Sequence, residues 1–107
     1  MNVLLTKGRL VGSVEADRNR MKPHLSPRQA EVVRLRSLGC DVTETAAILG
    51  ISKHTVLQHR AAAMEAFGTD KAALLTRVAI KHGFTSINDK LTVSEKRKCG
   101  RKNDGWN

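Results

Sequence analysis

The stretch DVTETAAILGISKHTVLQHR, residues 41–60, decides the fold. It reads as two short helices joined by a tight turn at Gly50, Ile51 and Ser52. Gly50 can adopt the left-handed conformation that ends a helix, and Ser52 is a residue type that caps the start of the next one. Ile51, between them, is expected to anchor the turn in the core. Two helices joined in this way predict a helix-turn-helix, a motif that places its second helix in the major groove of DNA.

The same start and stop signals recur on both sides of this stretch. Capping boxes at residues 26–29 (SPRQ) and 41–44 (DVTE) open the first two helices. The four expected helices run from Ser26 to Gly39, from Asp41 to Gly50, from Ser52 to Gly68, and from Thr69 or Asp70 to Gly83-Phe84. We therefore predict an all-α, four-helix domain over residues 25–84. A flexible N-terminal extension (1–24) and a flexible, disordered, basic C-terminal tail (85–107) are expected to flank it.

The charge of the chain indicates a polyanionic partner. Its 107 residues include 19 Lys and Arg against 10 Asp and Glu, a net charge of +9. Such a surplus is typical of proteins that contact nucleic acid or an anionic membrane surface. The two flanking segments are more basic per residue than the domain, as expected of arms that contact phosphates without reading sequence. A chain of this length has a core too small to enclose a catalytic cleft of ordinary size.

The third expected helix separates into two faces at 100° per residue. Val56, Ala63 and Phe67 gather on one side and are predicted to face the core. The predicted base-reading residues lie on the opposite side: His54, Leu57, Gln58 and Ala61. The amide of Gln58 can donate to and accept from the major-groove edge of adenine, and Leu57 and Ala61 suit thymine methyl groups. This face therefore favours half-sites that contain A·T pairs.

A second set of residues is predicted to contact DNA phosphates. These residues lie at or near the helix N-termini, where backbone N–H groups also point outward. The set consists of Thr43, Ser52, Lys53, Thr55 and His59. We expect His59 to be a helix-packing residue that also touches a phosphate.

Together these residues resemble the DNA-binding domain of LuxR-type regulators. The resemblance covers about sixty residues in order and rests on Leu25-Ser26-Pro27-Arg28, Glu31-Val32, Leu35, Gly39, Glu44, Ala46, Leu49-Gly50-Ile51-Ser52, Thr55-Val56, His59, Gly68 and Ala79. It implies a four-helix domain whose third helix reads the major groove through Leu57, Gln58 and Ala61. It also implies that the fourth helix pairs two copies of the domain.

For that pairing the sequence offers Leu74 and Val78. Leu75 and Ala79 already supply the inward face of the fourth helix, so we predict that Leu74 and Val78 form a dimer seam.

Several positions depart from the pattern of the family. Thr45 replaces a usual Ile and Arg36 a usual Leu, which predicts a thinner core. Glu65 and Ala66 stand where basic residues are common, and Ala72 where Arg is frequent. Several phosphate contacts are therefore missing, so either the basic tails compensate or the affinity for DNA is weak.

The length of chain before the domain also departs from the family. Relatives usually carry a receiver or a ligand-binding domain there, but only 24 residues precede Leu25. A stand-alone regulator is expected, and Met21 is an alternative start that would remove residues 1–20.

Other functional classes lack support in the sequence. Ser52 and Thr55 have no base at a fixed offset, which argues against an enzyme. His54 and His59 lack ligand spacing, so neither a metal nor another cofactor is expected. Cys40 and Cys99 form no disulfide framework. The chain has no apolar run that could span a membrane, which favours a cytoplasmic, nucleoid-associated protein.

Three functions remain from this reading. The first is a sequence-specific regulator that binds double-stranded DNA as a homodimer, with RNA polymerase as the further partner that activation would require. The second is a sigma-region-like module, against which His59, the fourth helix and the lack of a promoter-melting region argue. The third is a protein-interaction adaptor with weak or non-specific DNA binding.

Overall fold

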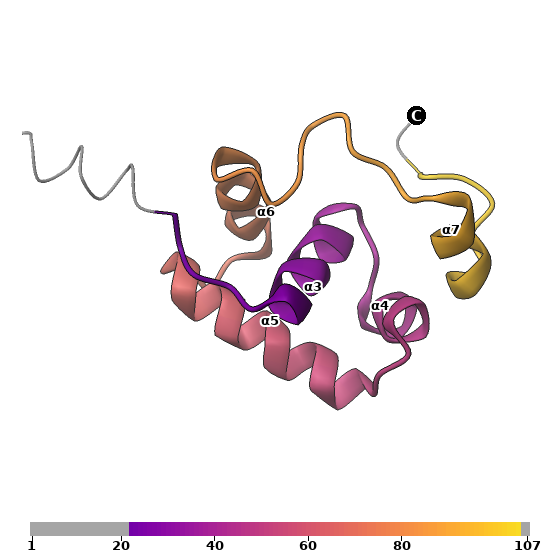
Figure 1. The fold of residues 1–107 in the computed structure, drawn as a ribbon, viewed down its shortest axis with the longest axis horizontal. Coiled ribbons are helices and arrows are strands. Elements are labelled where there is room, and N and C mark those ends of the chain that lie inside the picture. The colour runs from indigo at the N-terminus through magenta and orange to yellow at the C-terminus, as the bar shows by residue number, and fades with distance from the viewer. Residues whose placement is uncertain (1–21, 106–107) are drawn as a thin grey trace, which may run out of the picture.

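The computed structural model describes residues 22–105 as five helices (Figure 1). In chain order they are α3 (Pro27–Ser37), α4 (Val42–Leu49), α5 (Lys53–Phe67), α6 (Ala72–Lys81) and α7 (Val93–Cys99). No strand occurs within this range, so the prediction of an all-α fold is confirmed. The predicted N-terminal extension lies outside the described residues up to residue 21.

Two capping boxes start α3 and α4 where the sequence predicts them. The Ser26 hydroxyl accepts a hydrogen bond from the Gln29 N–H at 3.1 Å, and the Gln29 side chain accepts one from the Ser26 N–H at 3.0 Å. Asp41 and Glu44 form the same reciprocal pair at 2.7 and 3.0 Å. Each box satisfies two N–H groups that a helix start leaves without a partner.

The turn between α4 and α5 also forms as predicted. Gly50 has φ of 68°, the left-handed conformation that a glycine adopts without strain. Ser52 caps α5, since its hydroxyl accepts from the Thr55 N–H at 3.0 Å. Ile51 is half-buried and packs against the apolar cluster that joins α3, α4 and α5. The relative orientation of α4 and α5 is thus set by the three residues of this turn.

The prediction for the start of α6 was wrong. The residue at the cap position is Lys71, which makes no side-chain capping bond, rather than Thr69 or Asp70. The Thr69 hydroxyl instead accepts a hydrogen bond from the Lys71 N–H at 3.2 Å. This local turn uses the side chain that could have capped the helix, so α6 begins later in the chain.

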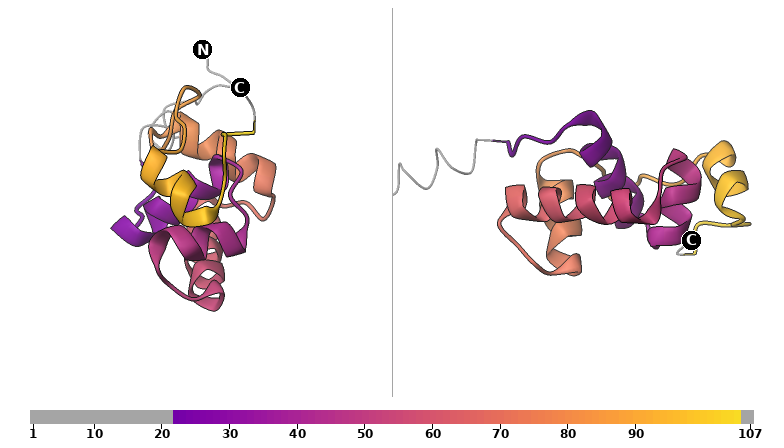
Figure 2. Two further views of the ribbon diagram at one scale, coloured as in Figure 1. Left: turned by 90° about the vertical axis from the view of Figure 1, so that its right-hand side faces the viewer. Right: turned by 90° about the horizontal axis from the view of Figure 1, so that it is seen from below.

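Helix α3 lies at the centre of the domain and contacts α4, α5 and α6 (Figure 2). Its inward side chains Val32, Val33 and Leu35 are at most 1% exposed. One cluster joins α3 to α5 and α6 and consists of Val33, Ala63, Met64, Leu75 and Ala79. A second joins α3 to α4 and α5 and consists of Val32, Ala46 and Val56. The core therefore holds α5 by one face and leaves the other uncovered.

The prediction of a disordered C-terminal tail was wrong for the described residues 85–105. Thr92 and Glu95 form a third capping box, which starts α7, and Gly100 ends this helix at φ of 79°. Just before α7, Leu91 is 4% exposed and packs into an apolar cluster with Leu35, Leu38, Cys40 and Ile48. The segment is ordered because it buries a leucine and because its carboxylates find cationic partners on the domain.

Two arginines tie this segment to the domain. Arg34 of α3 donates to Asp89 at 2.9 Å and to Glu95 at 2.8 Å. Arg101 donates to Glu44 of α4 at 2.8 Å. In Figure 1 and Figure 2, α4 lies between α5 and α7, and α4 makes contacts with both.

Candidate nucleic-acid interface

The outward face of α5 carries all four predicted base-reading side chains. His54, Leu57, Gln58 and Ala61 are exposed and recur at spacings of three and four residues, which places them on one side of the helix. Leu57 is 46% exposed although it is apolar, whereas Val56 beside it is fully buried. These four side chains thus supply one amide, one imidazole and two apolar groups, and the exposed Glu65, one turn beyond Ala61, adds a carboxylate at the end of the same face.

The core-facing side of α5 differs slightly from the prediction. Val56 and Ala63 are fully buried as predicted, but Phe67 is half-buried and stacks at a tilt against Phe84, with 5.7 Å between the ring centroids. Met64, which the helical wheel did not assign to the core, is buried. The buried side of α5 is therefore wider than predicted by one residue, Met64.

The predicted phosphate contacts lie at two helix N-termini and along one edge of α5. Thr43, Ser52 and Lys53 are exposed, and Thr55 and His59 are half-buried. The Ser52 and Thr55 hydroxyls lie 2.9 Å apart and share a hydrogen bond. Helix N-termini carry N–H groups without intrahelical partners, which attract anions. The arrangement thus offers two donor-rich ends beside the exposed face of α5.

Sequence reasoning missed two neighbouring arginines, Arg36 of α3 and Arg60 of α5. Both are half-buried, and neither side chain makes a hydrogen bond or ion pair within residues 22–105. Burial lowers the pKa of Arg36, and the positive charge of Arg60 lowers it further. Two cations held close together with no carboxylate bonded to either favour an anion. A signal was present, because Arg36 stands where the family usually has an apolar residue.

The outward face of α6 carries apolar side chains that are exposed or half-buried. Leu74 is 41% exposed and Val78 is half-buried, while Leu75 and Ala79 are buried against the core. A shallow groove on this face is lined by Leu74, Arg77, Val78, Ile80 and Lys81. The predicted dimer seam thus lies on an accessible apolar strip.

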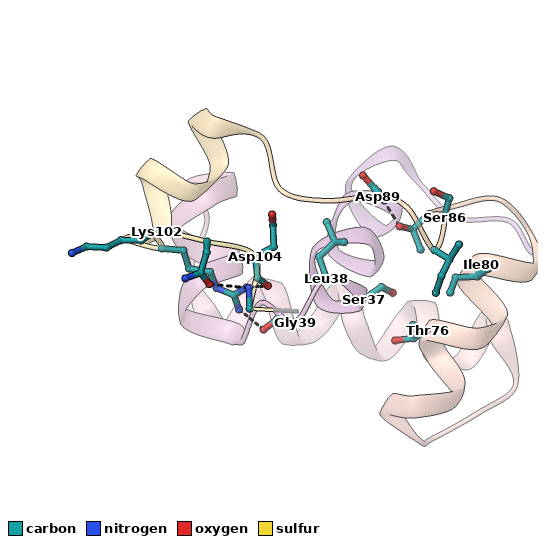
Figure 3. A pocket seen from close by; sticks show the side chains of 14 residues that line it. Ser37, Leu38, Gly39, Thr76, Ile80, Ser86, Asp89, Lys102 and Asp104 are labelled. Atoms are coloured by element: carbon teal, nitrogen blue, oxygen red, sulfur yellow. Dashed lines mark hydrogen bonds between the residues drawn. The ribbon is translucent and has the colours of Figure 1, made fainter. Parts of the chain in front are cut away.

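A larger cavity of about 610 Å³ lies between the end of α3, α6 and residues 101–105 (Figure 3). Leu38, Ile80 and Ile87 supply apolar lining, and the buried Ser37 hydroxyl beside them has no hydrogen-bond partner within residues 22–105. Its carboxylates are already paired: Asp89 with Arg34 and Asp104 with Lys96. The Thr85 hydroxyl in its lining donates to Asp89 at 2.9 Å. Burial raises the pKa of Asp89, but its hydrogen bonds with Arg34 and Thr85 leave the pKa below its ordinary value, so this carboxylate is a weak base for activating that hydroxyl.

Residues 22–105 hold no group of three or more His, Cys, Asp or Glu side chains arranged to bind a metal ion. They also include no helix that is both long and apolar enough to cross a membrane. Cys40 and Cys99 are free thiols in this structure.

Comparison with known proteins identifies the helical domain. Residues 23–79, more than half of the chain, match the family described as bacterial regulatory proteins, luxR family. No curated protein and no solved structure gives a match. The matched range includes α3, α4 and α5 and ends within α6, so α7 lies outside it.

Proposed function

The chain belongs to the luxR family of bacterial regulatory proteins, whose members are DNA-binding transcription regulators, and we propose that it reads specific sequences by inserting α5 into the major groove. The observation that carries this proposal is the exposed face of α5. Its side chains reach outward from a helix whose other side is fixed in the core. Base edges are read by side chains placed in this way.

We propose that this face selects A·T pairs. Gln58 is the one amide on it and can form two hydrogen bonds with adenine, while Leu57 and Ala61 pack against thymine methyl groups. His54, one turn earlier, adds a further polar contact at the edge of the site.

Phosphate contacts position the helix. They come from Thr43 at the start of α4, from Ser52, Lys53 and Thr55 at the start of α5, and from His59 along its edge. Arg36 and Arg60 add positive charge beside them. These contacts set register and affinity without adding sequence information.

We propose that two copies pair through α6. Leu74 and Val78 on its outward face bury against the same residues of a second copy, as a two-fold interface requires. Two α5 helices related in this way read two half-sites, so the target is an inverted repeat. Such a dimer would act in the cytoplasm at the nucleoid, and RNA polymerase is the further partner if it activates transcription.

One observation favours an alternative, an adaptor or sigma-region-like module with weak or non-specific DNA binding. The last turn of α5 carries no basic residue. Glu65 and Ala66 in that turn and Ala72 at the start of α6 are exposed, where basic side chains would otherwise meet phosphates. Without that charge, affinity for a duplex would fall.

The test of the proposed function is selection of binding sites from a random duplex library, followed by titration of the enriched duplex. We expect an inverted repeat rich in A·T pairs. Gln58→Ala should weaken binding by roughly five- to 150-fold and relax the preference at one position, since a bidentate base contact discriminates by about 1–3 kcal/mol. The matched control is Asn88→Ala, which removes an exposed amide far from α5. No enrichment, with equal affinity for all duplexes, would support the alternative.

A further inference from the structure

Helix α4 is unsuited to phosphate contact by its own charge. Its sequence, VTETAAIL, contains no lysine or arginine. The proposed phosphate contact Thr43 lies between two carboxylates, those of Asp41 and Glu44. Both carboxylates repel a phosphate group, so the first helix of the helix-turn-helix needs positive charge from elsewhere.

The C-terminal segment, residues 85–105, brings that charge. Arg101 donates to both oxygens of Glu44, with Nε to Oε2 at 2.8 Å and Nη2 to Oε1 at 3.0 Å. It also donates to the Gly39 carbonyl, just before α4, at 2.6 Å. The hydrogen bond from Arg101 lowers the pKa of Glu44, so this carboxylate is ionised at neutral pH and its charge is balanced by the guanidinium.

The carboxylates near and within this segment are already occupied. Asp89 and Glu95 pair with Arg34, and Asp104 pairs with Lys96 at 3.4 Å and accepts from the Leu91 N–H. Three exposed cationic side chains make no hydrogen bond or ion pair within residues 22–105, and all lie within four residues of Arg101: Arg97, Lys98 and Lys102. The surface beside the start of α4 is therefore left with an excess of positive charge.

The position of Lys102 can be followed in Figure 3. Its side chain points away from the cavity that its backbone lines, toward the outside of the molecule, while Asp104 stays close to Gly39. Lys102 is thus available to a partner in solution. An extended, regularly charged polyanion that already approaches Thr43 is the partner that this geometry fits.

We propose that Lys98 and Lys102, the free cations closest to Arg101 in the chain, contact the phosphate backbone of DNA next to the phosphates bound at α4. The C-terminal segment is then a second DNA-contacting element, independent of sequence and outside the part of the chain that matches the family. This inference rests on the proposed function. It adds a contact surface that the helix-turn-helix alone does not contain.

The test is the salt dependence of binding to the selected duplex, measured with the full chain. Each phosphate contact contributes about 0.9 to the slope of log affinity against log salt concentration. Lys98→Gln and Lys102→Gln should each lower the slope by about 0.9, and the double variant by about 1.8. Between about 50 and about 200 mM salt, the double variant should lose roughly tenfold less affinity than the unmodified chain.

The matched control is Lys90→Gln, which removes one exposed lysine that has no ionic partner within residues 22–105 and lies far from Arg101 along the chain. It should leave the slope unchanged. All variants should keep the thermal midpoint of the unmodified chain, because the side chains removed are exposed and make no hydrogen bond or ion pair within residues 22–105. A double variant with the slope of the unmodified chain would overturn the inference while the proposed function stands. A chain that binds no duplex would overturn both.

Discussion

The helix-turn-helix and the C-terminal segment are held in place by different forces. Helices α4 and α5 are positioned by local caps and by apolar side chains such as Ala46 and Val56. Helix α7 has no buried residue of its own and is held by Leu91 and by the two arginines Arg34 and Arg101. Apolar burial involves no charge, so neither titration nor ionic screening weakens it, whereas ion pairs depend on both pH and salt. The exposed face of α5 should therefore keep its position over a wide range of pH and salt. The position of the proposed second contact surface should depend on both.

Paired leucine truncations test this difference with the largest expected effect. Leu75→Ala empties a site 3% exposed between α3, α5 and α6, and it should lower the free energy of unfolding by about 2–5 kcal/mol. Leu91→Ala removes a side chain of similar burial, 4% exposed, but should chiefly release the C-terminal segment. Amide hydrogen exchange distinguishes the two outcomes. Equal loss of protection in α5 and α7 for Leu91→Ala would mean that the two regions unfold as one unit.

Removal of Arg34 should act next most strongly. Arg34→Gln leaves Asp89 and Glu95 partly buried without their cation, at a cost of about 1–3 kcal/mol, between the values for exposed and for buried pairs. The loss should appear as faster hydrogen exchange in α7. Protection of the α5 amides should stay unchanged, and a parallel loss there would contradict the division into two regions.

A fall in pH should weaken the docking of α7, as Arg34→Gln does. Burial raises the pKa of Glu95 and Asp89, but the hydrogen bonds and charge of Arg34 outweigh it, so the pKa of each ends below its ordinary value of 4.5 or 3.8. A carboxylate with a lowered pKa in the folded state stabilises above its unfolded pKa, and this contribution is lost as pH falls through the folded value. Docking of α7 should therefore be constant near neutrality and weaken below about pH 4.

The helix caps provide a matched pair of intermediate size. Ser52→Ala and Thr92→Ala each remove the hydroxyl that accepts from the third N–H of a helix, at a cost of about 1 kcal/mol of local helix stability. For Ser52 this should lower the thermal midpoint of the whole domain by roughly 4–8 °C. For Thr92 the midpoint should hardly move, and the helix signal in circular dichroism should fall instead.

The smallest effect is expected at Arg28. Its ion pair with Glu31, 3.2 Å long, is between side chains 42% and 54% exposed. Arg28→Ala should change the free energy of unfolding by less than about 0.5 kcal/mol, since water screens such pairs. A denaturant titration that shows a change above about 1 kcal/mol would mean that exposed ion pairs contribute more to the stability of this chain than screening by water allows.

The sequence predicts the helix-turn-helix better than it predicts the C-terminal segment. The starts of α3, α4 and α5 were predictable because Ser26, Asp41 and Ser52 act on backbone groups within three residues. Helix α7 has an equally local signal in Thr92 and Glu95, but the excess of basic residues around it favours a prediction of disorder. What stabilises it is long-range, since Arg34 and Glu95 are 61 residues apart. Pairings over such distances cannot be derived from spacing.

For the candidate site too, local features of the sequence predict more than they can for contacts between distant residues. Periodicity was enough to predict that His54, Leu57, Gln58 and Ala61 are exposed on one face of α5. It could not show that Arg101 would balance Glu44, 57 residues away in the chain. Nor could it place Arg36 beside Arg60, because that proximity depends on how α3 crosses α5.

The buried Cys40 can report on whether the C-terminal segment is docked on the domain. Burial raises the pKa of its thiol to about 11, so almost no thiolate exists near neutral pH while Leu91 and the rest of the cluster cover it. In a Cys99→Ser background, the rate of alkylation of Cys40 should therefore increase with the fraction of molecules in which the C-terminal segment has lifted away. The slower this reaction becomes when a duplex is added, the more tightly that segment is held by DNA.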